Sequence, residues 1–193
     1  MDIGVDQRCL GPVDVAAIRE RILAQGPAAW TEQALRQQTY EVHKDTESIV
    51  MLFCEESWPD GEIYREAGWD RLADVAQPVV DRIIAANYEP GGIVLRAMAA
   101  KLKAGGRINP HRDKLHSFHI GHRVHVPLTT NNAVRFTIGG KPYAFEVGNA
   151  YEINNQKVHS VMNLGRDDRI TFIFDYVPPD RVAESAHTGK SIA

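Results

Sequence analysis

Two histidines and one aspartate carry the clearest chemical signal in the sequence. His111 and Asp113 are separated by one residue, so in an extended strand their side chains would point to the same face. His159 lies far enough along the chain for a separate strand to bring it back to them. Two imidazoles and one carboxylate hold Fe(II) on one face and leave the opposite positions open for a co-substrate and dioxygen. The spacing therefore predicts a metal site made of His111, Asp113 and His159.

Arg169 is suited to bind a carboxylate near that metal. It begins a run of residues, 169–176, whose composition is typical of a strand. A guanidinium can bind a carboxylate through two parallel hydrogen bonds. A metal triad followed by such an arginine favours an oxygenase that uses Fe(II), 2-oxoglutarate and dioxygen. The alternative is a chance arrangement, because a chain with 8 histidines easily contains a His-x-Asp pair.

Arg123 and His125 are further candidates for the same pocket. Both lie in a strand expected at 123–128, where alternate side chains share a face, and both are close in sequence to the triad. Convergent polar groups on one face are typical of a binding site, and a solvated outer face is the alternative. We expect these two side chains to face the pocket.

Four more histidines follow His111 and raise the alternative of a zinc site: His116, His119, His122 and His125. Structural zinc clusters usually include cysteine ligands, and both cysteines, Cys9 and Cys54, lie far away in the sequence. These cysteines are expected to be reduced thiols and not a disulfide framework. We expect a loop over residues 114–121 that crosses the mouth of the site, with its histidines mostly at the surface.

Length and composition indicate one ordinary globular domain over residues 1–193. Hydrophobic residues make up 44% of the chain and charged residues 24%, which is typical of such domains. The net charge of -3 gives no general electrostatic reason to expect nucleic acid or a membrane as a partner. No apolar stretch is typical of a signal peptide or a membrane span, so a cytoplasmic protein is expected.

The two halves of the chain differ in their hydrophobic pattern. Residues 1–92 are expected to form a mixed helical region on the substrate side, with helices at 13–25, 31–38 and 69–88, a strand at 48–53, and a kink or break at Pro78. Residues 93–177 contain strand-like runs separated by turns, at 93–103, 123–128, 133–138, 141–146, 149–153, 159–163 and 169–176. Residues 178–193 are expected to be a frayed tail.

Evenly spaced short strands of this kind predict a mainly β (α+β) fold. A jelly roll, similar to a cupin, can hold a ligand between its two sheets or at its mouth. The N-terminal helical layer would cover one sheet and shield an edge strand.

Six sequence blocks resemble the aspartyl/asparaginyl β-hydroxylase family. They are INPHRD at 108–113, RVHVPLTTN at 123–131, FTIGG at 136–140, GNAYEINN at 148–155, VHSVMN at 158–163 and RITFIFD at 169–175. The resemblance covers about residues 93–177 and implies a double-stranded β-helix fold, Fe(II), and 2-oxoglutarate as co-substrate. It implies metal ligation by His111 and His159 and binding of the distal carboxylate of 2-oxoglutarate by Arg169. Arg123 and His125 match the family's RxH element, which contacts the other end of the co-substrate.

The chain departs from the family's pattern at two positions. Asp113 stands where the animal peptide-hydroxylating members have glycine, and it restores a full facial triad, as in the bacterial proline hydroxylases of the same superfamily. Ala100 corresponds to a serine that helps to bind 2-oxoglutarate in the animal enzymes.

The expected function is a dioxygenase reaction coupled to decarboxylation of 2-oxoglutarate. The enzyme would hydroxylate a carbon of an amino acid or of an Asp/Asn-type residue in a peptide, and would release succinate and CO2. The alternatives are a cupin-like metal enzyme that does not use 2-oxoglutarate, a non-catalytic sensor that binds metal or 2-oxoglutarate, and a structural β-domain with incidental histidines.

Overall fold

The computed structural model describes residues 1–32 and 44–188 of the chain. Most of the helix expected at 31–38 lies outside the described residues. Of its two described residues, Thr31 ends a short helix α2 (Pro27–Thr31) and Glu32 caps that helix.

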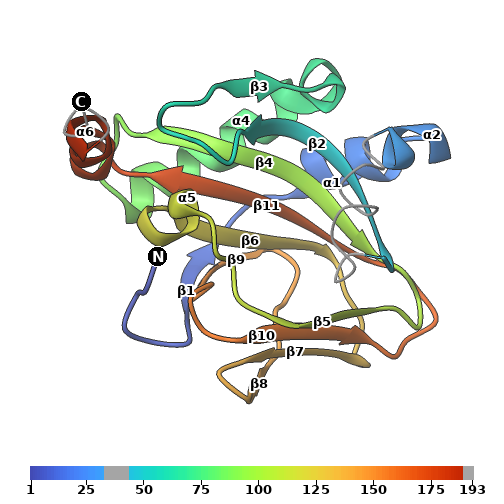
Figure 1. The fold of residues 1–193 in the computed structure, drawn as a ribbon. Coiled ribbons are helices and arrows are strands. Elements are labelled where there is room, and N and C mark those ends of the chain that lie inside the picture. The colour runs from blue at the N-terminus through green and yellow to red at the C-terminus, as the bar shows by residue number, and fades with distance from the viewer. Residues whose placement is uncertain (33–43, 189–193) are drawn as a thin grey trace.

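Two antiparallel sheets lie face to face (Figure 1). The larger sheet has seven strands in the order β1 (Gln7–Pro12), β9 (Asn149–Ile153), β6 (His122–Thr129), β11 (Arg169–Val177), β4 (Ile93–Leu102), β2 (Thr46–Cys54) and β3 (Ile63–Arg65). The smaller sheet has four strands in the order β5 (Arg107–His111), β10 (His159–Asn163), β7 (Val134–Ile138) and β8 (Lys141–Tyr143). The predicted mainly β jelly-roll fold is therefore confirmed.

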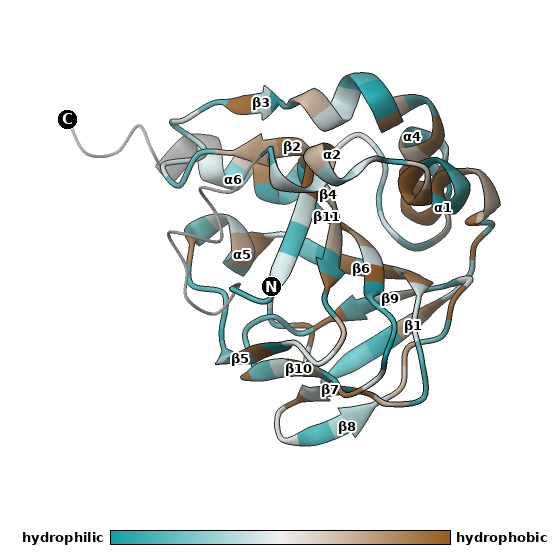
Figure 2. Cartoon of the chain, turned by 90° about the vertical axis from the view of Figure 1, so that its right-hand side faces the viewer, coloured by the Kyte–Doolittle hydropathy of each residue, from teal (hydrophilic) through white to brown (hydrophobic). Residues whose placement is uncertain are grey.

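Helices cover the outer face of the larger sheet, which confirms the expected helical layer. Both views place α1 (Ala16–Leu23) and α4 (Ala67–Asn87) on the side of this sheet away from the smaller one (Figures 1 and 2). The apolar side of α4 buries Leu72, Val79 and Ile83 against this sheet. The helix continues through Pro78 without a break.

The inner face of the larger sheet holds the residues that matter for a site. Alternate residues of β11 point inward, and the strand register places their neighbours in rows across the sheet. The row at Asp175 contains Arg96 of β4 and Arg123 of β6. The next row contains Met98, Ile173 and His125, and Thr171 pairs with Ala100 one step further on. Arg169, opposite Leu102, ends the series.

Several strands were not expected from the sequence, for reasons that the structure makes clear. Strand β1 contains Gly11 at φ 99° and a register shift, so it lacks a regular alternation. Strand β5 contains Pro110, which is tolerated there because β5 lies at an edge of the smaller sheet. Strand β3 is only three residues long.

Two short helices replace segments that were expected to be irregular. Residues His116–Ile120 form α5 within the expected 114–121 loop, and the buried side chain of Ser117 fixes this helix to the larger sheet. Residues Pro179–Thr188 form α6 within the expected tail, where Val182 packs against a small core cluster and Ser185 is buried. Neither contact could be read from local sequence.

None of the helices in the described residues is long and apolar enough to cross a membrane. Cys9 is exposed and Cys54 is buried, and neither forms a disulfide.

Candidate active site

The structure brings together one potential metal-binding group from the predicted residues. Potential ligand atoms of His111, Asp113 and His159 lie within 4.8 Å of one another. His111 ends β5 and His159 begins β10, and the two residues face each other in the register of the smaller sheet. Asp113 lies just beyond β5 and not within it, so an irregular segment, and not strand alternation, directs its carboxylate toward His111.

Backbone carbonyl groups orient both imidazole rings. Nδ1 of His111 lies 2.8 Å from the carbonyl oxygen of Asn109, and Nδ1 of His159 lies 3.0 Å from that of Lys157. Such hydrogen bonds from Nδ1–H leave Nε2 as the nitrogen positioned for a metal. Burial lowers the pKa of His159, which keeps the neutral ring that a metal requires. The donor set and its geometry therefore fit a divalent metal ion such as Fe(II).

The Asp113 carboxylate has one oxygen directed toward the site and one held by the protein. Oδ1 lies 3.8 Å from Nε2 of His111, whereas Oδ2 accepts a 2.8 Å hydrogen bond from NH1 of Arg123. The backbone N–H of Asp113 also donates to the carbonyl oxygen of Asn155, at 3.2 Å. These contacts fix the carboxylate so that a single oxygen remains available for a metal.

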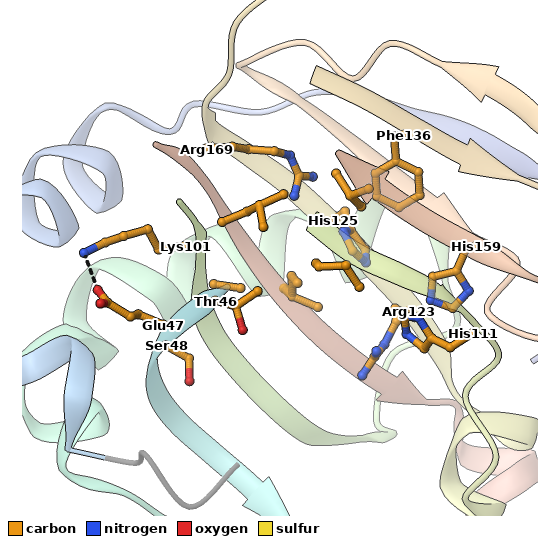
Figure 3. A pocket seen from close by; sticks show the side chains of 15 residues that line it. Thr46, Glu47, Ser48, Lys101, His111, Arg123, His125, Phe136, His159 and Arg169 are labelled. Carbon is orange, nitrogen blue, oxygen red and sulfur yellow. Dashed lines mark hydrogen bonds and ion pairs between the residues drawn. The ribbon is translucent and has the colours of Figure 1, made fainter. Parts of the chain in front are cut away.

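A cavity leads from this group along the inner face of the larger sheet to Arg169 (Figure 3). The volume of the cavity is about 60 Å³, and its mouth is open to the solvent. Figure 3 shows His111 and His159 together at one end, Arg169 apart from them, and His125 between. Thr46, Glu47 and Ser48 of β2 also line the cavity.

Buried polar atoms without hydrogen-bond partners line this cavity. In the described part of the chain these include NH2 of Arg169 and both ring nitrogens of His125. An unpaired buried donor is costly, so such atoms at a cavity wall indicate a polar ligand. Burial lowers the pKa of Arg169 to about 10, so the side chain stays cationic at neutral pH. Burial, with the neighbouring Arg169 and Arg123, holds the pKa of His125 well below its usual value, and its ring is neutral.

Arg123 lines the cavity but makes strong contacts to the protein. Besides NH1 on Asp113, its Nε and NH2 donate to the two oxygens of Asp175, at 2.8 and 2.9 Å. Although burial alone would lower the pKa of Arg123, the two carboxylates raise it further above its usual value. The expected contact of Arg123 with 2-oxoglutarate therefore stays a prediction, in competition with these two carboxylates.

Three further histidines of the described residues lie outside the metal-binding group. His116 and His119 are exposed on α5, as expected of surface groups. His122 points to the opposite face of β6 from Arg123, where its Nδ1 lies 2.5 Å from a carboxylate oxygen of the buried Glu152. The structure thus places none of the three with the triad.

Two residues near the site were not predicted to take part in it. Asp175 binds Arg123, and the amide of Gln156 donates to the carbonyl oxygens of Asp113 and Phe118. Asp175 shares the inward face of its strand with Arg169, so strand alternation carried a signal for it. No sequence pattern indicated Gln156, because its contacts join segments that are distant along the chain.

Comparison with solved structures identifies the class of fold. A 2OG-Fe(II) oxygenase family oxidoreductase from Burkholderia pseudomallei has 12% sequence identity and a TM-score of 0.55, over 88% of this chain and 92% of that chain. A prolyl hydroxylase from Trichoplax adhaerens, in complex with a hypoxia inducible factor peptide fragment, has 12% identity and a TM-score of 0.54, over 93% and 87%. The viral collagen prolyl hydroxylase of Paramecium Bursaria Chlorella virus-1 has 9% identity and a TM-score of 0.51, over 91% and 97%. At these identities the likeness establishes the fold.

The family follows from the sequence itself. Residues 19–179 match the family model for aspartyl/asparaginyl beta-hydroxylase, which is most of the chain, and the chain belongs to this family. No curated protein matches the sequence significantly. The protein is thus a hydroxylase of the class that uses Fe(II), 2-oxoglutarate and dioxygen, and the predicted family, enzyme class and cofactors are confirmed.

Proposed function

We propose that the enzyme hydroxylates a carbon of an amino acid, or of an Asp/Asn-type residue in a peptide, and converts 2-oxoglutarate and dioxygen into succinate and CO2. One oxygen atom of dioxygen enters the product as the hydroxyl group and the other enters succinate. The observation that carries this proposal is the cavity between the metal-binding group and Arg169, with unpartnered polar atoms along it. The two ends of such a cavity suit the two ends of 2-oxoglutarate.

Each predicted site residue has a role in this proposal. His111, Asp113 and His159 hold Fe(II), which with 2-oxoglutarate and dioxygen supplies the oxidising power to hydroxylate an unactivated carbon. Arg169 binds the distal carboxylate of 2-oxoglutarate through its unpartnered NH2. The neutral ring of His125, between them, can donate one hydrogen bond to a co-substrate oxygen.

Arg123 has a different role from the one that the family pattern implies. Its hydrogen bond to Oδ2 of Asp113 leaves Oδ1 directed at the metal position. We assign Arg123 primarily to holding this carboxylate, as a positioning residue next to a metal ligand. The RxH contact to 2-oxoglutarate remains the alternative.

Less specific observations support the class of substrate, the kind of partner and the cellular location. The family's name and the peptide bound by the Trichoplax enzyme support an amino acid or peptide substrate. The net charge of -3 supports neither nucleic acid nor membrane as a partner. Two cysteines without a disulfide suit the cytoplasm.

We further propose that residues 1–193 act as one domain. Strands β1, β2 and β3 come from the 1–92 region yet complete the larger sheet, whose other strands belong to the 93–177 core. Strand β2 also lines the cavity, which supports the proposal that the 1–92 region lies on the substrate side. Residues 178–193 add α6 beyond the core.

The direct functional test is formation of succinate from 2-oxoglutarate. The purified full chain is incubated with Fe(II), 2-oxoglutarate and dioxygen, first alone and then with pools of amino acids and peptides. We expect slow succinate formation alone, faster formation with a substrate, and a 16-dalton gain in its mass. A protein that forms no succinate in any mixture would support the alternative of a sensor or of an enzyme that does not use 2-oxoglutarate.

A further inference from the structure

Arg96 is a buried cation with few of its hydrogen bonds made. The residue is only 2% exposed. Its NH1 donates to the hydroxyl oxygen of Ser117 over 3.0 Å, and its NH2 has no partner in the described residues. The nearest carboxylate, that of Asp175, lies 3.6 Å from NH1, beyond a good hydrogen bond, and already accepts two hydrogen bonds from Arg123. Arg96 therefore keeps donors and positive charge for another acceptor.

Aromatic rings enclose this guanidinium. Its central carbon lies 4.4 Å from the ring centre of Phe118 in α5 and 5.5 Å from that of Phe53 in β2. Both phenylalanines are half-buried, so each is in contact with the solvent as well as with the guanidinium. A cation held in place between aromatic rings loses little flexibility when it binds an anion.

Arg96 and Arg169 lie toward opposite ends of the inner face of the larger sheet. Along β11, Arg169 is at one end of the inner face and Asp175, the register partner of Arg96, is at the other. Six residues separate those two positions, which corresponds to about 20 Å along an extended strand. The cavity reaches the Asp175 row at Arg123, next to the metal-binding histidines. If Arg169 binds the distal end of 2-oxoglutarate, Arg96 lies on the side left for the other substrate.

Arg96 shares its nearest carboxylate, that of Asp175, with Arg123. Asp113 and Asp175 both accept hydrogen bonds from Arg123, and Asp113 would also face a divalent metal. Arg169 would be matched by the distal carboxylate of 2-oxoglutarate. Among the buried residues of this face, Arg96 then has no carboxylate of its own, and a further anion would balance it.

We propose that Arg96 binds a carboxylate of the molecule that is hydroxylated. This inference rests on the proposed function and narrows its substrate to a carboxylic acid. The acid is either a free amino acid, bound by its α-carboxylate, or a peptide, bound by an aspartate side chain. Phe53 and Phe118 would flank the bound group, and Ser117 would hold the guanidinium in place.

A comparison of acids with their neutral analogues tests this proposal on the wild-type protein. The full chain, loaded anaerobically with Fe(II) and 2-oxoglutarate, is titrated with free amino acids and with their α-carboxamides. Aspartate-containing peptides are compared in the same way with the matching asparagine peptides. We expect at least one acid to bind about 30-fold more tightly than its amide, the lower limit for a buried, hydrogen-bonded charge pair. The arm in which this happens distinguishes an α-carboxylate from a side-chain carboxylate.

Substitution of Arg96 tests the residue itself. Arg96→Gln should weaken binding of the preferred acid about 30-fold and leave binding of its amide nearly unchanged, and Arg96→Lys should recover part of the loss. Arg19→Gln is the matched control, because Arg19 donates to a backbone carbonyl from α1, on the outer side of the same sheet. If Arg96→Gln does not fold, the comparison of acid and amide in the wild type still tests whether the protein recognises a carboxylate.

Three outcomes would overturn the proposal: no acid of the panel binds, acid and amide bind equally, or Arg96→Gln binds the acid as the wild type does. Failure of the proposed function would look different, because the wild type would then form no succinate with Fe(II), 2-oxoglutarate and dioxygen. Succinate formation without any preference for acids would reject only the role of Arg96.

Discussion

Arg123 donates a hydrogen bond to Asp113 over 2.8 Å, from NH1 to Oδ2, and so joins the inner face of the larger sheet to the metal-binding group. The same guanidinium is anchored on Asp175 by two further hydrogen bonds. Because Asp113 lies beyond the end of β5, no strand register fixes its side chain, and Arg123 supplies that constraint. This arrangement makes metal binding depend on a residue that is not itself a ligand.

Replacement of Arg123 should therefore weaken metal binding. We expect Arg123→Gln to lower the affinity for Fe(II), measured without 2-oxoglutarate by competition with a chelator, by about 10- to 100-fold. Arg169→Ala serves as the control and should bind Fe(II) as the wild type does, because Arg169 lies at the far end of the cavity. Unchanged metal affinity together with weaker binding of 2-oxoglutarate would favour the family's RxH contact instead.

Substitution of each triad residue in turn should show how much that residue contributes to Fe(II) binding. His111→Ala and His159→Ala should abolish Fe(II) binding, since only one imidazole and one carboxylate would remain as ligands. Asp113→Ala should bind Fe(II) more weakly and keep some turnover, because family members with glycine at this position are active. Calorimetric titration with Fe(II) under anaerobic conditions measures all three. Wild-type affinity in His159→Ala would reject the assignment of the triad.

Stability at low pH should depend on Glu152, which is fully buried and contacts His122 and Arg8. Burial alone would raise the pKa of Glu152, but these two partners hold it below its usual value of 4.5. A depressed pKa stabilises the folded state above the unfolded value, and this stabilisation is lost as the pH falls below about 4.5. The protein should therefore unfold at lower urea concentration at pH 4 than at pH 7.

The variant Glu152→Gln tests that source of stability. At pH 7 it should lose about 2 kcal/mol in free energy of unfolding, less than for a fully buried pair because Arg8 is 45% exposed. The difference from the wild type should shrink at pH 4. Asp74→Asn, which breaks an exposed ion pair with Arg21, should change stability by no more than about 0.5 kcal/mol. Equal losses at both pH values for Glu152→Gln would contradict the prediction.

The regular parts of the fold could be predicted from local sequence. Strands such as β6 and β11 alternate between polar and apolar residues, and α4 repeats its apolar residues with helical spacing, so their side-chain periodicity suffices. Strand β5 escaped prediction because Pro110 is disfavoured in strands except at an edge, and edge position is a property of the assembled sheet. Helix α5 depends on the contact of Ser117 with Arg96, far away in sequence.

The residues of the candidate site, like the elements of the fold, could be predicted from the sequence only in part. The residue types and spacing of His111, Asp113 and His159 were informative because metal chemistry demands particular side chains. The role of Arg123 could not be inferred, since its partners are set by the register of three strands, and a resemblance to the family indicated another contact. Arg96 carried no signal, because one buried arginine in an apolar strand can be recognised only from its missing partners.

Anaerobic calorimetric titration of 2-oxoglutarate into the Fe(II)-loaded protein shows whether 2-oxoglutarate binds between the metal and Arg169. We expect one binding site in the wild type and at least about 30-fold weaker binding in Arg169→Ala, since a buried, hydrogen-bonded charge pair loses one partner. Arg169→Lys should recover little, because an ammonium cannot make the two parallel hydrogen bonds of a guanidinium. Absence of binding to the wild type, or equal affinity in Arg169→Ala, would contradict binding between the metal and Arg169.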